Sequence, residues 1–196
     1  MTASIVTGQM TAGQFFDFVH RPENQGRHLE LVRGEVTEMS RPGELHDLVC
    51  GNVAWALNNY VRQRKQGRVL ANDPGIIVER DPDTVRGPDV VLFDDHKAYD
   101  QLNPKFAEGT PALVVEVLSP NDRVGKVTRR IGEYLKAGIP LVWIVDPEAR
   151  DVTVHRTGVP SEVLEGDQEL TGYDLLPGLR CRLADLFFVP GEAEAG

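Results

Sequence analysis

Hydrophobic positions along the chain switch repeatedly between helical spacing and strand-like runs, a pattern typical of an α/β domain. Apolar residues at helical spacing predict helices at 12–20, at 46–64 and in the segment after residue 119. Short apolar or alternating runs predict strands at 28–39 (a hairpin), 69–71, 76–79, 88–93, 112–118, 141–145 and 152–155. We expect a turn at 81–84 and a loop or short helix at 94–109. The order of these elements predicts a mixed β-sheet flanked by helices.

The predicted helix starts carry capping signals. Thr11 is placed to cap the first helix. For the third helix, Ser119 as N-cap, Pro120 at the first helical position and Asp122 at the third match a capping arrangement. A helix start nearer Arg123 is the alternative.

Length and composition indicate one globular domain. The 196 residues suit a single domain over 1–196 with its own core, and we expect loose ends at 1–10 and 190–196. A hydrophobic content of 41% disfavours disorder elsewhere. The N-terminus has no signal-peptide pattern and no apolar run is long enough to span a bilayer, so we expect a cytoplasmic protein. Cys50 and Cys181 form no metal-ligand spacing and are expected to be buried thiols.

The net charge of −9 disfavours nucleic-acid binding by the protein as a whole, because Lys and Arg supply most of the attraction to phosphate. In two segments, however, the local charge is positive. Basic residues gather at Arg62, Arg64, Lys65 and Arg68, and again at Arg123, Lys126, Arg129, Arg130 and Lys136. Each group is either a solvated helix face or part of a surface that meets phosphate.

One carboxylate, Glu116, interrupts the apolar strand PALVVEVL, and a second, Asp89, opens the short apolar strand PDVVLF. A charge in a buried strand is costly unless it is paired or binds a metal. If the two strands pair in one sheet, both carboxylates lie at one site. Ligation by oxygen alone suits Mg²⁺ or Mn²⁺. The alternative is that each acid caps a strand end or belongs to an ion pair.

Basic residues follow on the predicted helix after Glu116. Lys126 and Arg130 are four residues apart and therefore share one helix face, from which one of them could reach the carboxylates. A cation there would stabilise the transition state of phosphodiester hydrolysis. The alternative is that both point to solvent. Trp55, Tyr134 and Trp143 lie at periodic positions and are expected in the core.

Several motifs together resemble the Uma-type restriction endonuclease family of the PD-(D/E)xK nuclease superfamily. They are GPDVVLF with Asp89, VVEVLSPNDR with Glu116, the basic helix that ends in EYLKAGIP, and LVWIVDPEARDVTVHR. ELVRGEV, IIVERDPDTVRGPDV and LLPGLRCRLADLF extend the likeness over most of the chain. The resemblance implies a restriction-endonuclease-like core and a Mg²⁺-dependent endonuclease that hydrolyses DNA.

The resemblance also implies roles for individual residues. Asp89 and Glu116 would hold the divalent metal. The superfamily lysine, two positions after the acid, would fall on Leu118 and is absent there. A lysine on the next helix substitutes for it in the Uma-type pattern, and that position holds Arg130, whose guanidinium cannot act as a base. Lys126, one turn earlier, is the nearest replacement.

Two further residues precede the long helix where the superfamily often adds an acidic group. Glu44 is the acid, and His46 matches the family's histidine as a water-orienting residue or a ligand. His46 could equally cap the helix start.

The sequence therefore predicts a metal-dependent DNA endonuclease in which Asp89 and Glu116 bind Mg²⁺, with Mn²⁺ as a possible substitute. Lys126 or Arg130 would support the transition state. A catalytically silent member that binds nucleic acid or a protein is the alternative, motivated by the missing lysine and the acidic balance. A metal-free hydrolase that uses the two acids as general acid and base is a third option. A homodimer is expected only because symmetric pairs are common.

Overall fold

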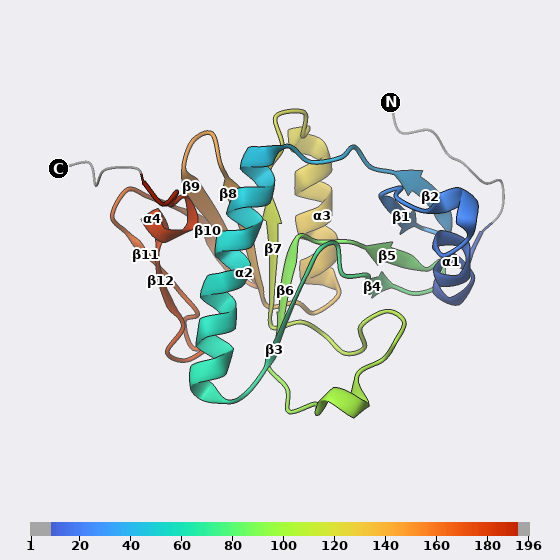
Figure 1. Ribbon diagram of the computed structural model, residues 1–196, viewed down its shortest axis with the longest axis horizontal. Coiled ribbons are helices and arrows are strands. Elements are labelled where there is room, and N and C mark those ends of the chain that lie inside the picture. The colour runs from blue at the N-terminus through green and yellow to red at the C-terminus, as the bar shows by residue number, and fades with distance from the viewer. Residues whose placement is uncertain (1–8, 192–196) are drawn as a thin grey trace.

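The computed structural model describes residues 9–191, with a central six-stranded sheet, a smaller sheet at one end and helices between and around them (Figure 1). Residues 1–8 and 192–196, which make up most of the predicted loose ends, lie outside the described part. The predicted α/β class with a mixed sheet flanked by helices is confirmed. Within the described residues no helix is both long and apolar enough to cross a membrane.

The central sheet has the strand order β10-β9-β8-β7-β6-β3. Its strands are β3 (Arg68–Ala71), β6 (Val90–Phe93), β7 (Leu113–Val117), β8 (Leu141–Asp146), β9 (Asp151–Arg156) and β10 (Val159–Glu165). The neighbours β7 and β8 are parallel and the other pairs are antiparallel. A parallel pair needs a crossover, and helix α3 (Val124–Lys136) provides it.

Strand alternation separates the two faces of this sheet. On β7, Val115 and Val117 belong to the core shared with the long helix α2 (Glu44–Arg64). Val114 belongs to the core on the opposite face, where it packs with Tyr134 of α3. Because side chains alternate along a strand, Glu116 projects to the α3 face. The predicted buried strand is thus covered on both sides, with its carboxylate under α3.

The smaller sheet has the order β2-β1-β5-β4 and packs against helix α1 (Ala12–Val19). Its strands are β1 (Leu29–Val32), β2 (Glu35–Glu38), β4 (Ile76–Glu79) and β5 (Thr84–Arg86). The predicted cap is present, because Thr11 and Gln14 form a capping box. The predicted hairpin joins β1 and β2 through Arg33 and Gly34, both at positive φ, as a tight two-residue turn requires.

The remaining elements are short. They are two 3₁₀ turns at Pro22–Asn24 and Tyr99–Gln101, the strands β11 (Glu169–Thr171) and β12 (Arg180–Arg182), and helix α4 (Leu183–Leu186). α4 lies against α2, where Asn52 Nδ2 donates to the carbonyl oxygen of Leu186 at 3.0 Å. The C-terminal segment thereby packs along one side of α2 (Figure 1).

Two local expectations were wrong. The N-cap of α3 is Arg123, the predicted alternative, and not Ser119, because the Ser119 N–H donates to Asp122 Oδ2 at 2.8 Å and holds this segment as a turn. Trp55 is 66% exposed on α2, whereas Tyr134 and Trp143 are buried as predicted. The expected turn at 81–84 is confirmed for residues 80–83, and it leads directly into strand β5, which pairs with β1 and β4.

A buried ion network joins the smaller sheet to α3. Glu30 of β1 accepts from Arg86 of β5 at 2.7 Å and from Arg130 of α3, and its Oε1 also accepts the Gly87 N–H at 3.0 Å. Arg86 Nη2 in turn lies 2.7 Å from Glu133 Oε2 on α3. Burial opposes ionisation of Glu30, but the attraction of the two arginines outweighs it and lowers the pKa of this carboxyl. Glu30 is therefore a buried anion that depends on both partners.

Replacing Glu30 with glutamine removes the charge that pairs with both arginines, and we expect the free energy of unfolding at neutral pH to fall by about 3 kcal/mol. The lowered pKa stabilises the fold above the unfolded-state value of about 4.3, and this contribution disappears as the pH falls through the folded-state pKa. The difference between wild type and Glu30→Gln should therefore narrow in acid. Urea unfolding across this pH range measures it.

The matched control is Glu38→Gln, which breaks the exposed pair between Glu38 and Arg27. An exposed pair contributes little, so we expect almost no change. A loss of similar size in both variants, or a Glu30 effect that persists in acid, would contradict this account of the network.

Candidate active site

The register between β6 and β7 brings the two predicted carboxylates opposite each other. The two strands are antiparallel, with Val90 opposite Val115. One further step along this register puts Asp89 opposite Glu116. Residues that face each other across antiparallel strands project on the same side, with Cβ atoms about 5 Å apart. Strand pairing alone therefore makes Asp89 and Glu116 neighbours.

Two elements hold the Asp89 carboxylate. The Val117 N–H donates to Oδ2 at 2.7 Å, and Nε2 of His46, in the first turn of α2, lies 3.2 Å from Oδ1. Asp47 Oδ1 lies 3.3 Å from the other ring nitrogen of His46. Burial lowers the pKa of His46, but the attraction of Asp89 and Asp47 outweighs it and raises the pKa to about 9. His46 is therefore charged at neutral pH and orients Asp89.

Both oxygens of Glu116 are also engaged. Arg130 Nη1 donates to Oε2 at 2.6 Å, and the hydroxyl of Tyr134 donates to Oε1. Burial raises the pKa of Glu116 and the charge of Asp89 adds to this effect, while Arg130 and Tyr134 offset it only in part, so the pKa is about 7. Arg130 reaches Glu30 with its second terminal nitrogen. One guanidinium therefore bridges two buried carboxylates.

A cavity of about 490 Å³ opens above these carboxylates, with Glu30, His46, Asp89, Glu116 and Arg130 in its wall. A second depression of about 730 Å³ adjoins it, and the two share Arg86, Glu116 and Arg130 in their linings. Its further basic lining residues are Arg123, Lys126 and Arg129. The cavity that these carboxylates line thus continues into a basic groove along α3, which we call the α3 groove.

The structure separates the two basic candidates of α3. Arg130 contacts Glu116, whereas Lys126 is exposed one turn earlier and lines the α3 groove. Glu44 is exposed at the start of α2, two residues before His46, and is not among the lining residues of the described cavity. Of the six predicted site residues, the structure brings together Asp89, Glu116, His46 and Arg130, and it places Lys126 in the adjoining α3 groove.

The other basic gathering, around the end of α2, differs in its partners. Arg64 lies 3.0 Å from Asp94, and Arg68 lies 2.9 Å from Asp95. These two charges are balanced by aspartates on the segment after β6. The α3 groove is therefore the basic surface that adjoins the carboxylates.

Sequence reasoning missed Glu30 and the part that Tyr134 plays. Glu30 reaches the site from the smaller sheet, a hundred residues before Arg130, and only the tertiary fold brings the two together. No local signal marked it, because Glu30 holds the polar position between Leu29 and Leu31, where alternation predicts a side chain in solvent, whereas the structure buries both Glu30 and Leu31. Tyr134 was correctly predicted in the core, but its hydroxyl also fixes Glu116.

The donor chemistry of this pair fits a hard divalent cation. Asp89 and Glu116 offer four carboxylate oxygens at one cavity wall, and oxygen is the ligand that Mg²⁺ and Mn²⁺ prefer. Each oxygen keeps acceptor capacity beyond the single hydrogen bond described above. Arg130 is the competitor, because its guanidinium occupies Glu116 Oε2. A cation held by Glu116 would have to share or displace this contact.

Comparisons with known proteins agree with this picture. One solved structure similar to the chain is described as a putative nuclease belonging to DUF820 from Anabaena variabilis, with a TM-score of 0.75 and 22% sequence identity. The match covers 91% of this chain and 97% of that chain. It confirms the predicted fold.

Sequence comparison gives the family. A search of curated proteins found no match. The family described as "Uma2: Putative restriction endonuclease" matches residues 15–184, which include every predicted site residue. The resemblance deduced from the motifs is confirmed. The chain therefore belongs to the Uma2 family.

Proposed function

We propose that this protein is a metal-dependent endonuclease that hydrolyses DNA phosphodiester bonds at Asp89 and Glu116. The observation that carries the proposal is the pairing of these two carboxylates in a cavity that continues into the α3 groove. The family and the nuclease-like fold support a nuclease in general terms. Metal dependence and DNA as substrate are our extension of that support.

The chain's residues have separate tasks in this proposal. Asp89 and Glu116 hold the cation, Val117 N–H and His46 fix Asp89, and Tyr134 fixes Glu116. When bound, Mg²⁺ or Mn²⁺ would supply Lewis-acid stabilisation of the phosphate charge and lower the pKa of water. Without any cation, the pKa of Glu116 near 7 leaves this carboxyl partly protonated at neutral pH. A cation binds only the ionised carboxylate, so cation binding must displace the proton from the protonated fraction of Glu116.

Basic residues of the α3 groove would hold the phosphate backbone. Lys126 and Arg129 are exposed on α3, and both line the groove that Glu116 also lines. Lys126 carries an ammonium group on a flexible stem in this groove and is suited to stabilise charge on the scissile phosphate. The net charge of −9 is compatible with DNA binding because the basic residues are concentrated on this one surface.

A catalytically silent protein that binds nucleic acid or a protein partner is the second candidate, and one observation favours it. Arg130 bridges Glu116 and Glu30 within the network that joins the smaller sheet to α3. If this bridge persists in the presence of Mg²⁺, Glu116 stays an ion-pair partner and the protein binds its ligand without cleaving it.

Cytoplasmic location and a homodimer remain predictions from the sequence.

Asp89→Asn and Glu116→Gln should each reduce Mg²⁺-dependent nicking of supercoiled plasmid DNA by about 100-fold or more, because each removes a charged oxygen ligand. Gel analysis of the nicked and linear products measures the rate. Asp167→Asn, in the exposed turn after β10, is the matched control and should leave the rate unchanged.

Three other outcomes would contradict the proposed endonuclease, each in a different way. Cleavage that persists in both variants would place the chemistry elsewhere. Cleavage in excess chelator would favour the metal-free hydrolase. DNA binding by a wild-type protein that does not cleave with Mg²⁺ or Mn²⁺ would favour the silent candidate.

Removing Lys126 or Arg129 tests the α3 groove independently of catalysis. Each neutralised phosphate contact contributes about one unit to the dependence of log K on log salt concentration. We expect Lys126→Ala and Arg129→Ala each to lower this slope by about one and to weaken binding similarly for all DNA sequences. Fluorescence anisotropy with labelled duplex DNA at several salt concentrations gives the slope.

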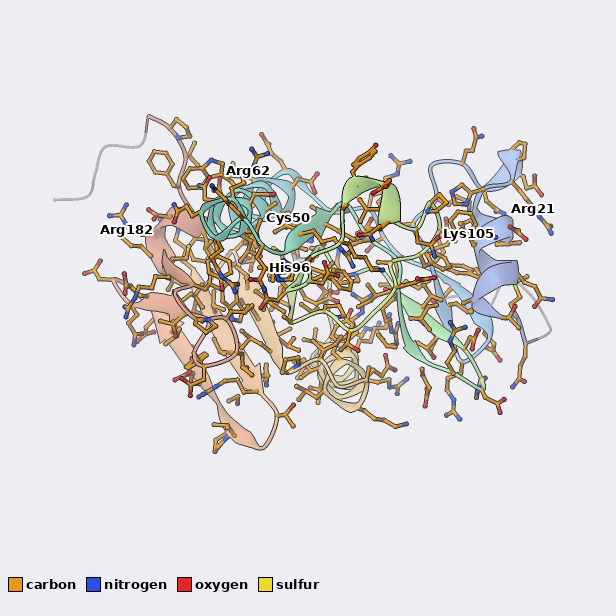
Figure 2. All side chains as sticks on the ribbon, turned by 90° about the horizontal axis from the view of Figure 1, so that it is seen from below. Arg21, Cys50, Arg62, His96, Lys105 and Arg182 are labelled. Carbon is orange, nitrogen blue, oxygen red and sulfur yellow. The ribbon has the colours of Figure 1, made fainter. Side chains whose placement is uncertain are left out.

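Arg62→Ala is the control for the groove variants. Arg62 is exposed on α2 and projects on the side of the molecule away from α3 (Figure 2). Its removal should leave the slope unchanged. An equal effect of all three substitutions would mean that binding follows overall charge and not the groove.

A further inference from the structure

A histidine, a cysteine and an aspartate meet where α2 passes the start of β6. His46 and Cys50 are four residues apart on α2 and therefore lie on one face of the helix. Cys50 Sγ lies 3.5 Å from Nδ1 and 4.0 Å from Nε2 of His46, and Nε2 lies 3.2 Å from Asp89 Oδ1. One donor atom from each residue lies within 4.8 Å of the other two. Figure 2 labels Cys50 on α2.

These three donors are the set that a zinc ion takes in proteins. Zn²⁺ binds Cys sulfur at about 2.3 Å, His nitrogen at about 2.0 Å and carboxylate oxygen at about 2.1 Å. Because the set has one sulfur, two of its donors can lie at most about 4.4 Å apart on one ion, so a small rotation of the Cys50 side chain would bring the set within reach. Mg²⁺ does not favour thiolate, and this set therefore differs in kind from the oxygen pair of Asp89 and Glu116.

A second observation points to a ligand site. Asp47 Oδ1 lies 3.3 Å from Nδ1 of His46, on the ring nitrogen that the proposed ligation leaves free. Metal-binding histidines usually donate their other ring N–H to such a carboxylate, which fixes the ring and raises its basicity. His46 matches that pattern, because Asp47 lies at Nδ1 and a cation would bind at Nε2.

We infer that His46 Nε2, Cys50 Sγ and Asp89 Oδ1 form a binding site for a thiophilic divalent cation such as Zn²⁺. Water completes the coordination, because three protein ligands leave one tetrahedral position open. Burial raises the pKa of Cys50, so Cys50 is a thiol in the metal-free protein. Zinc binding would displace two protons, one from the Cys50 thiol and one from Nε2 of the charged His46, and both would leave to solvent.

The site shares Asp89 with the proposed Mg²⁺ site. Zn²⁺ would take Asp89 Oδ1 and the His46 nitrogen that otherwise orients it. We therefore expect Zn²⁺ to inhibit the cleavage proposed above, and this consequence alone rests on the proposed function. Binding itself is independent of nuclease activity.

Cobalt spectroscopy of the full chain tests the site without any activity assay. Chelator-treated, reduced protein is titrated with Co²⁺, which replaces Zn²⁺ in such sites and shows a thiolate charge-transfer absorption when sulfur is a ligand. We expect this band to saturate near one equivalent of Co²⁺ and to disappear when Zn²⁺ is added, because Zn²⁺ outcompetes Co²⁺ for tetrahedral sulfur-containing sites.

Three variants give the test its controls. Cys50→Ser should abolish the band, and Cys181→Ser, which removes the buried thiol of β12, should leave it unchanged. Asp47→Asn should weaken Zn²⁺ affinity by about tenfold, since it removes the carboxylate behind His46. Circular dichroism confirms that each variant is folded. The inference is overturned if the wild type shows no thiolate band, if the band survives Cys50→Ser, or if Asp47→Asn leaves the affinity unchanged.

Discussion

The salt bridges that Arg130 forms with Glu116 and Glu30 are the interaction on which the rest of this structure depends. They connect the central sheet, the smaller sheet and α3 through one guanidinium. Arg86 extends the same network from Glu30 to Glu133. Removing one partner of a buried pair leaves an uncompensated charge, so these residues hold the fold and the cavity together. The same contact occupies the carboxylate that a catalytic cation needs. Arg130, which stabilises the fold, and the cation therefore compete for Glu116.

The site combines two kinds of cation ligand at the neighbouring strands β6 and β7. On the α3 side, Glu116 faces arginine and tyrosine donors, and the α3 groove continues from it. On the α2 side, Asp89 faces the histidine and, through it, the cysteine and second aspartate of the first helical turns. A hard cation would join the two carboxylates, whereas a thiophilic cation would join Asp89 to α2. Asp89 is the residue common to both.

Much of the fold could be predicted because apolar residues that recur every second position indicate a strand and those that recur every 3.6 positions indicate a helix, each with one buried face. The apolar strand around Glu116, the hairpin at Arg33 and Gly34, and the long helix α2 follow from local signals alone. The α3 start could not be read from Ser119, because a side chain that caps a helix and one that closes a turn look alike in sequence. Trp55 was misplaced because it is two residues from the buried Val53 and Leu57 and therefore lies on another face of α2.

The two carboxylates were predictable because each stood out in an apolar strand, and pairing of β6 with β7 then made them neighbours. Glu30 and Arg86 were not, because they come from strands that are far apart in the sequence and become neighbours only when β1 pairs with β5 in the smaller sheet.

Manganese-soaked crystals, with anomalous diffraction, test the central claim most directly. The account predicts one anomalous peak between the carboxylates of Asp89 and Glu116, with the Arg130 contact to Glu116 shared with the cation or displaced by it. No peak there, with Arg130 still bonded to Glu116, would contradict it.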